Sequence, residues 1–159
     1  SFSILLGLFI YQLNHFLRIP NSLLIFSGYS FNDDHLNDTI LSALKANPNS
    51  MVIAMMFNTL TYTEGENQIE RYPKAMPLAL NRGNLAIWAD DEAIIGTVRG
   101  KWKTVGELEP EDNLAECIVK LAATDTEPER LNLKLGDFSK LGDFLQALIG
   151  YNQTKLDEK

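Results

Sequence analysis

Three short apolar segments constrain the fold of this chain more than any other feature of its sequence. They cover residues 22–27, 51–57 and 84–88. Strands that are apolar on both faces are typical of parallel sheets with helices on each side. Between the first two segments, Leu36, Ile40 and Leu44 recur at helical spacing. A strand, a helix and a strand within about 35 residues form a βαβ unit, so the sequence predicts an α/β protein with a parallel sheet.

Other segments predict elements around these strands. Apolar residues at helical spacing predict a helix over residues 9–17, which ends before Pro20. Polar residues predict a loop over 58–68, and a helix is expected over 69–80. Alternating residues over 93–102 predict the partner strand of a hairpin.

The last third of the chain is predicted to form an α/β extension. Its expected elements are an acidic loop, a helix, a strand and a closing helix, over residues 107–113, 114–123, 131–135 and 138–148. We therefore divide the chain into residues 1–106, which hold the sheet, and residues 107–159, which form the extension.

An acidic composition limits the partners of the chain. Its formal net charge is −7, so it has no general attraction for phosphate backbones, and we expect neither broad nor direct sequence-specific nucleic-acid binding. Its single cysteine, Cys117, can form neither an internal disulfide nor a four-thiolate zinc site, which points to a reducing cytoplasm. The apolar residues 4–10 are too few to span a bilayer, so we expect no membrane partner. Without an initiator methionine, we interpret them as a core helix or strand inside a longer gene product.

The turns after the three apolar strands are the candidate binding sites, because open parallel sheets bind ligands outside the carboxyl ends of their strands. Gly28 allows a sharp turn, and Ser30 offers a hydroxyl. Asp33 and Asp34 follow at a helix start, where their charge would repel phosphate, so a neutral ribose fits better than a pyrophosphate. The same residues equally allow a structural interpretation, in which the glycine only turns and the aspartates only cap the helix.

The other polar residues carry weaker signals. Asn58 could bind a sugar or a base, although capping a turn explains it as well. Asp90 and Asp91 could receive the edge of an adenosine, but acidic turns are usually just solvated. His15 and His35 are interpreted as packed or surface residues and not as a catalytic base. No histidine pair has metal-ligand spacing, and no GxGxxG, GxxxxGK[ST] or GxSxG motif occurs.

Residues 24–37 read Leu-Ile-Phe-Ser-Gly-Tyr-Ser-Phe-Asn-Asp-Asp-His-Leu-Asn and strongly resemble the second-half signature of prokaryotic sirtuin-like domains. In that signature a buried strand runs into Gly-Tyr-Ser-Phe and an acidic helix start. Residues 51–58 resemble the next strand of the family, and residues 84–91 resemble its last sheet strand with an acidic end. The resemblance covers roughly the first hundred residues, and Gly-Tyr-Ser-Phe-Asn-Asp-Asp is its only specific motif.

The resemblance implies the second half of a Rossmann-like parallel sheet with flanking helices, followed by a C-terminal hairpin and the α/β extension. It also implies NAD as the ligand, bound as a substrate. Gly28 and Ser30 would face the ribose on the adenosine side, Asn58 would lie near that ribose, and the turn after the last strand would lie near the adenine. The predicted cofactor-binding residues are Gly28, Tyr29, Ser30, Phe31, Asn58, Ala89 and Asp90.

In the sirtuin-like family, the pyrophosphate loop, an asparagine and the histidine base precede this region. None of them is found in this chain, so we assign no catalytic residue here and expect this segment to be inactive by itself. The single cysteine and the long region after the hairpin favour the bacterial antiphage-defence branch. Its members hydrolyse NAD to nicotinamide and ADP-ribose, and often work with a HerA-type ATPase.

The resemblance leaves three functions open for the intact protein. The first is an NAD glycohydrolase, expected to form a homo-oligomer and to have a HerA-type ATPase as a partner. The second is an NAD-dependent protein deacylase or an ADP-ribosyltransferase. The third is a non-catalytic NAD-binding or assembly module, in which the extension would dock a partner or another subunit.

Overall fold

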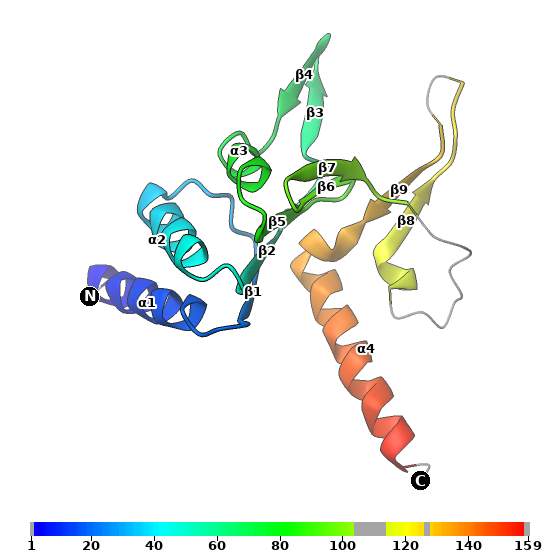
Figure 1. Cartoon of the computed structure of the whole chain (residues 1–159). Coiled ribbons are helices and arrows are strands. Elements are labelled where there is room, and N and C mark those ends of the chain that lie inside the picture. Colours follow the sequence, from blue (N-terminus) through cyan, green and yellow to red (C-terminus); the bar gives the residue numbers. More distant parts are fainter. Residues whose placement is uncertain (1, 104–113, 126–127, 158–159) are drawn as a thin grey trace.

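The computed structural model describes residues 2–103, 114–125 and 128–157, and the side chains of residues 7–103, 114–125 and 128–149 (Figure 1). Its main sheet has five strands in the order β1-β2-β5-β6-β7. The parallel strands are β1 (Leu23–Ser27), β2 (Met51–Met55) and β5 (Leu85–Trp88). The antiparallel strands are β6 (Glu92–Ile95) and β7 (Val98–Lys101). The predicted α/β class, the three parallel strands and an antiparallel partner after the third are confirmed. The segment predicted as one partner strand over 93–102 forms two strands, β6 and β7, separated by a turn at residues 96–97.

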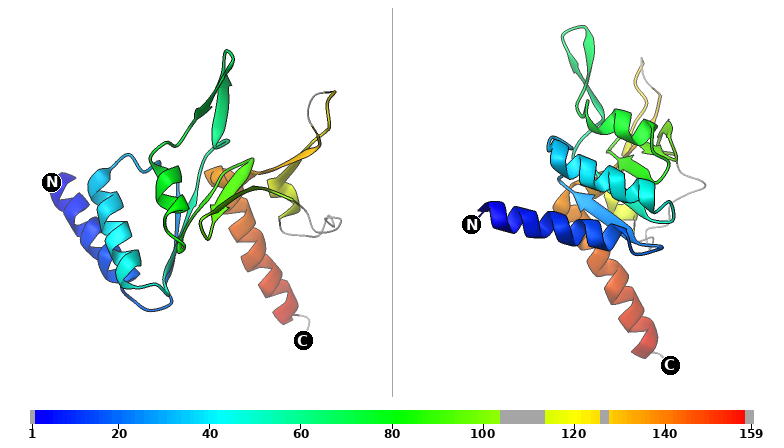
Figure 2. Two further views of the ribbon diagram at one scale, coloured as in Figure 1. Left: turned by 45° about the horizontal axis from the view of Figure 1, so that its top comes forward. Right: turned by 60° about the vertical axis from the view of Figure 1, so that its left-hand side comes forward.

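One face of the sheet is covered by three helices. These are α1 (Phe2–Leu17), α2 (Asp34–Ala46) and α3 (Ala75–Leu80), which Figures 1 and 2 show on the same side of the sheet. Helix α2 begins after its cap residue Asp33, whose carboxylate accepts a hydrogen bond from the Leu36 N–H at 3.0 Å. Its apolar face then packs on the sheet, and the largest buried side chains between the two layers include Leu17, Ile40, Val52, Leu85 and Ile87.

The C-terminal extension covers part of the opposite face. It consists of η1 (Ala115–Cys117), β8 (Ile118–Leu121), β9 (Arg130–Leu133), η2 (Lys134–Gly136) and α4 (Phe138–Asp157). Strands β8 and β9 pair antiparallel in a small sheet of their own. A second core forms where this extension meets the main sheet, and its buried members are Met55, Cys117, Leu133, Leu135 and Leu141. The chain therefore has three layers: helices, sheet and extension.

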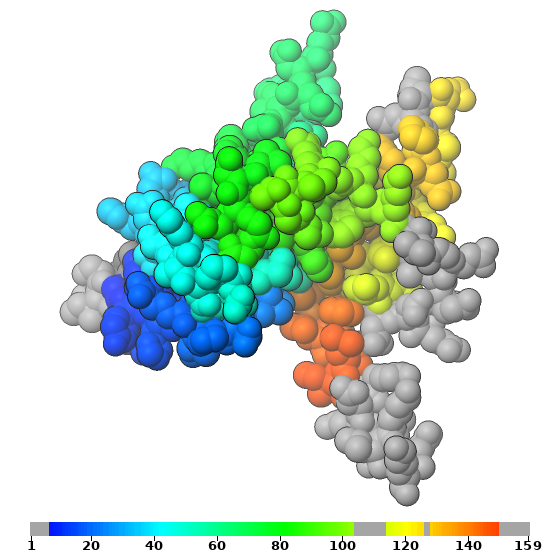
Figure 3. All heavy atoms as spheres, viewed as in Figure 1, coloured from blue at the N-terminus to red at the C-terminus, as the bar shows by residue number. Residues whose placement is uncertain are grey.

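Three sequence-based predictions about secondary structure are wrong. The expected loop over 58–68 contains a hairpin, formed by β3 (Thr61–Glu64) and the start of β4 (Asn67–Glu70), which projects from the body of the molecule (Figure 3). The expected helix over 69–80 is therefore reduced to α3. The expected helix over 114–123 is replaced by η1 and β8. The predicted acidic loop over 107–113 lies outside the described residues.

Local chemistry explains these differences. Gly65 turns the β3–β4 hairpin with φ of 62°, and a glycine at the first turn position is typical of a tight type II′ hairpin. In β8, Ile118 and Val119 are β-branched and prefer the extended backbone, and β9 supplies the partner strand that the sequence pattern alone does not reveal.

Strand β1 lies at one edge of the main sheet and is covered on only one face. Leu24 and Phe26 pack against the helical core. On the other face Leu23 is 51% exposed and Ile25 is 45% exposed. The expectation that this strand is buried on both faces is therefore wrong for the described residues, because the extension packs on β2 and β5 and does not reach across β1.

The position of Ile87 predicts how strongly the central strand contributes to stability. Its side chain is 0% exposed in the core between β5 and the helices, whereas Ile95 at the end of β6 is 43% exposed. We expect Ile87→Ala to lower the free energy of unfolding by about 2–5 kcal/mol, because it leaves a cavity. The matched control Ile95→Ala should cost less than about 1 kcal/mol. Urea denaturation followed by circular dichroism measures both, and equal losses would contradict the assignment of this core.

Candidate functional site

The carboxyl ends of the three parallel strands meet at one edge of the sheet, where the backbone bends sharply. Gly28 follows β1 with φ of 76°, and Phe31 has φ of 61°. Asn58 follows the end of β2 with φ of 66°. Positive φ is easy for glycine but costs energy for other residues, so surrounding contacts must hold Phe31 and Asn58 in place.

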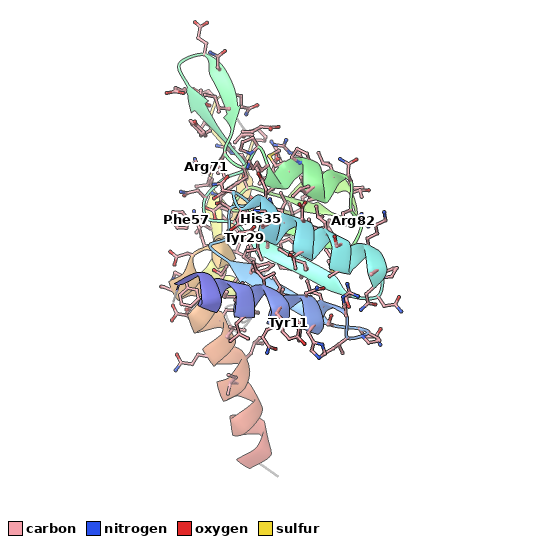
Figure 4. All side chains as sticks on the ribbon, turned by 90° about the vertical axis from the view of Figure 1, so that its left-hand side faces the viewer. Tyr11, Tyr29, His35, Phe57, Arg71 and Arg82 are labelled. Carbon is pink, nitrogen blue, oxygen red and sulfur yellow. The ribbon has the colours of Figure 1, made fainter. Side chains whose placement is uncertain are left out.

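A small pocket opens between the turns after β1 and β2. Its volume is about 80 Å³, and its lining residues are Gly28, Tyr29, Ser30, Met55, Met56, Phe57 and Tyr72. Tyr29 and Phe57 lie together at this end of the molecule, and Arg82 lies at the opposite end of the sheet (Figure 4). Sites that enclose a whole small ligand usually measure about 300–1,000 Å³. This pocket therefore fits only one group of a ligand, such as part of a sugar.

The turn after β1 is held by a buried amide. The Asn37 side chain donates to the Phe31 carbonyl at 2.8 Å and accepts from the Tyr29 hydroxyl at 2.7 Å. The Tyr29 ring also packs on the rings of Phe26 and Phe31, at centroid distances of 5.3 Å and 4.7 Å. Burial raises the pKa of Tyr29 to about 12, with a further contribution from the nearby carboxylates of Asp33 and Asp34. The hydroxyl therefore stays a hydrogen-bond donor at physiological pH.

Carboxylates surround the start of helix α2 beside this turn. Asp33 caps the helix, and Asp34 forms an exposed ion pair with Lys74 at 2.9 Å. The hydrogen bond from Lys74 and its positive charge lower the pKa of Asp34, so this carboxylate is ionised at neutral pH. Two negative groups at the helix N-terminus oppose the attraction of the helix dipole for an anion. The Ser30 hydroxyl lies in the same turn and accepts a hydrogen bond from the Asn32 amide at 2.9 Å.

Asp90 connects the ends of β2, β5 and β9. Its N–H donates to the Asn58 carbonyl at 3.0 Å, and its own carbonyl accepts from the Leu133 N–H at 2.7 Å. Its carboxylate, only 5% exposed, forms an ion pair with the Lys134 ammonium. The extension thus contacts the candidate site directly.

The turn after β5 is closed by protein contacts. The Ala89 N–H donates to the Glu92 carbonyl at 2.9 Å, and the Ala89 carbonyl accepts from the Trp102 indole N–H at 2.8 Å. Ala89 is buried, and its backbone groups are already paired. Ala89 itself therefore offers a ligand little access, in contrast to the residues of the turn after β1 that line the pocket.

The structure brings the predicted site residues to one edge but gives them different surroundings. Gly28, Tyr29 and Ser30 line the pocket, and Asn58 follows the pocket residue Phe57. The side chains that the protein buries are those of Phe31, Ala89 and Asp90. Both histidines are exposed and neither lines the pocket; His15 lies near the end of α1, and His35 lies in the first turn of α2.

Three important residues were not among the predictions. Asn37 holds the first turn, Tyr72 lines the pocket and donates to the Phe57 carbonyl, and Lys134 pairs with Asp90. Only Asn37 had a signal in the sequence, because it is a polar residue on the apolar face that includes Leu36. Tyr72 and Lys134 reach the edge through tertiary packing.

The fold and the site define an α/β protein with a small pocket at the carboxyl ends of its parallel strands, where such sheets bind ligands. A scan against protein-family models and a search of curated proteins found no match for the chain. Within the described part of the chain, no group of three or more His, Cys, Asp or Glu side chains could hold a metal ion. No helix described by the structure is long and apolar enough to cross a membrane.

The contacts of Tyr29 predict a pH-dependent contribution to stability. Tyr29→Phe removes the hydrogen bond to Asn37, and should cost about 0.5–1.5 kcal/mol at neutral pH. The folded state raises the pKa of this phenol from 10.0 to about 12, so it favours the neutral form. The resulting stabilisation is complete below pH 10 and is lost as the pH rises from 10 to about 12.

Urea denaturation at pH 7 and at several values between pH 9 and 12 tests this prediction. The Tyr29→Phe variant should lose less stability across that alkaline range than the wild-type chain does. Tyr62→Phe, on the projecting β3–β4 hairpin, is the matched control and should change stability at pH 7 by less than about 0.5 kcal/mol. Parallel alkaline profiles for Tyr29→Phe and the wild type would contradict the assignment.

Proposed function

We propose that this chain is the adenosine-binding half of a sirtuin-like protein that hydrolyses NAD. The main support for the proposal is that three features lie close together at one edge of the sheet. The Gly28–Ser30 turn lines a small pocket, the Asn58–Asp90 hydrogen bond lies beside it, and an acidic helix start replaces the usual anion site. These are the positions that the resemblance assigns to the adenosine side of NAD.

The chemistry of the pocket favours a sugar over a phosphate. Its polar groups include the hydroxyls of Ser30 and Tyr72, which can exchange hydrogen bonds with ribose hydroxyls. The ionised carboxylate of Asp34 and the capping carboxylate of Asp33 would repel a phosphate placed at the same helix end. The adenosine ribose would therefore face Gly28 and Ser30, and the pyrophosphate would leave the pocket toward the open edge of β1.

The reaction itself would take place on the nicotinamide side. Water attacks the ribose carbon that bears nicotinamide, the carbon–nitrogen bond breaks, and the products are nicotinamide, ADP-ribose and one proton. The residues of this chain would bind and orient the other half of NAD. The role in bacterial antiphage defence and the HerA-type ATPase partner are parts of the proposal that rest on the resemblance alone.

Incubation of the protein expressed from its natural gene with NAD tests this function. We expect chromatography to detect nicotinamide and ADP-ribose in equal amounts. Ser30→Ala and Asn58→Ala should each raise the KM for NAD about three- to tenfold, as expected when a hydrogen bond of roughly 0.5–1.5 kcal/mol is lost. Ser42→Ala, an exposed position on α2, is the matched control and should leave the KM unchanged.

Two outcomes would redirect the assignment. Formation of O-acetyl-ADP-ribose with an acetylated peptide would support the deacylase alternative, and modification of a protein target would support an ADP-ribosyltransferase. A wild-type protein that neither binds nor consumes NAD would refute the proposal.

A second candidate function, an assembly module, is favoured by the free edge of β1. The Met51 N–H donates to the Ser22 carbonyl at 2.9 Å, so the backbone of Ser22 points toward β2. Because backbone groups alternate along a strand, those of Leu23, Ile25 and Ser27 point to the outer edge. Strand β1 therefore has unpaired backbone groups that can bond to another strand. It also lacks the charged side chains that usually protect sheet edges.

Charge placed on this strand tests the assembly function. We expect Ile25→Lys to shift the protein expressed from its natural gene toward smaller species in size-exclusion chromatography with light scattering. Val98→Lys, at the exposed opposite edge of the same sheet, is the matched control and should leave the mass unchanged. A wild-type protein that is monomeric at every concentration would count against assembly through β1.

A further inference from the structure

The extension meets the carboxyl edge of the main sheet through the short turn η2. At the start of this turn, the Lys134 ammonium pairs with the nearly buried carboxylate of Asp90. At its end, Gly136 lies so close to β2 that a Cβ atom there would overlap the Met56 carbonyl oxygen. The turn therefore packs against the ends of β2 and β5 together, and only a glycine fits at its second contact.

These contacts lead to the candidate pocket in two steps. Met56 is itself a lining residue of the pocket. The N–H of Asp90 donates to the carbonyl of Asn58, which has a positive φ and directly follows the lining residue Phe57. The Asp90 N–H therefore helps to fix the backbone of the residue that directly follows the pocket residue Phe57.

The Lys134 side chain decides where the Asp90 carboxylate lies. A nearly buried carboxylate without a positive partner is strongly unfavourable, so loss of the lysine would draw Asp90 toward water. That movement would pull on the Asn58 carbonyl through the Asp90 N–H. An ion pair outside the pocket can thus set the geometry inside it.

We propose that Lys134 is a positioning residue of the nucleotide site, which acts through Asp90 to hold Asn58 in its binding conformation. This inference rests on the proposed function, because it assigns the extension to the NAD site that the sheet edge forms. The extension then serves as part of the binding domain, and its role is to keep the adenosine side of the site in shape.

Steady-state kinetics of the protein expressed from its natural gene test the inference. Lys134→Met should raise the KM for NAD roughly tenfold while kcat changes less than about twofold, because only substrate positioning is affected. Lys134→Arg keeps the charge and should restore a KM within about twofold of wild type. Lys120→Met, an exposed lysine on β8 of the same extension, is the matched control and should behave as wild type.

A double-mutant cycle shows whether Lys134 acts through Asp90. In an Asp90→Asn background no carboxylate remains to be held, so Lys134→Met should change the KM less than about twofold. If Lys134→Met alone does not fold, Lys134→Gln replaces it as the single variant of the cycle. An equal effect of Lys134→Met in both backgrounds would overturn the inference.

The kinetic outcomes separate the inference from the proposed function. A wild-type protein with NAD hydrolysis and a Lys134→Met variant with an unchanged KM would overturn the inference alone. A wild-type protein without NAD binding or hydrolysis would overturn both.

Discussion

Apolar strands that pair in parallel need cover on both faces, and two different parts of the chain supply it for β2 and β5 but not for the outer face of β1. Helices α1, α2 and α3 cover one face, and α2 and α3 lie on the same side because both crossovers move in the same direction along the sheet. The C-terminal extension covers the other face over β2 and β5. The extension therefore forms a third layer packed on the sheet, since Met55 of β2 and Leu133 of β9 share one core.

The same arrangement makes the carboxyl edge asymmetric. At β5, the Ala89 carbonyl is paired with the Trp102 indole, and the Asp90 carboxylate is paired with Lys134. At β1, the turn at Gly28 faces an open pocket, and the neighbouring face of the strand is exposed. The exposed face beside β1 gives a ligand in this pocket room to extend away from the extension. This direction agrees with the proposal that the adenosine ribose lies at Gly28 while the rest of NAD continues outward.

The sequence predicted the elements whose burial pattern is periodic and local. Segments 22–27, 51–57 and 84–88 gave β1, β2 and β5, because continuous apolar runs have few alternatives in an α/β chain. The loop predicted over 58–68 was wrong because the β3–β4 hairpin packs little on the rest of the molecule and so has no strong apolar pattern. The helix predicted over 114–123 was wrong because β8 depends on its pairing with β9. The turn residues did indicate the hairpins β3–β4 and β6–β7. In each of them the first turn residue is a glycine with positive φ, Gly65 or Gly96.

The sequence predicted the site residues that directly follow a strand. It did not predict the contacts between residues that are far apart in the sequence. Parallel pairing alone brings Gly28, Ser30 and Asn58 to one edge. The pairing of Lys134 with Asp90 joins residues 44 positions apart, and no local pattern reveals it. Nor does a pattern reveal that Phe31 turns its ring into the core.

The free edge of β1 links the two candidate functions. Strands in a sheet lie about 4.8 Å apart, so a strand that paired in parallel with β1 would end beside the Gly28 turn. The loop after that strand would then face the open side of the pocket, where the proposed ligand leaves this chain. Pairing at β1 would bury the outward backbone groups of Leu23 and Ile25. The two proposed functions, assembly at this edge and binding of a whole nucleotide, would therefore share one structural requirement, a neighbour for β1.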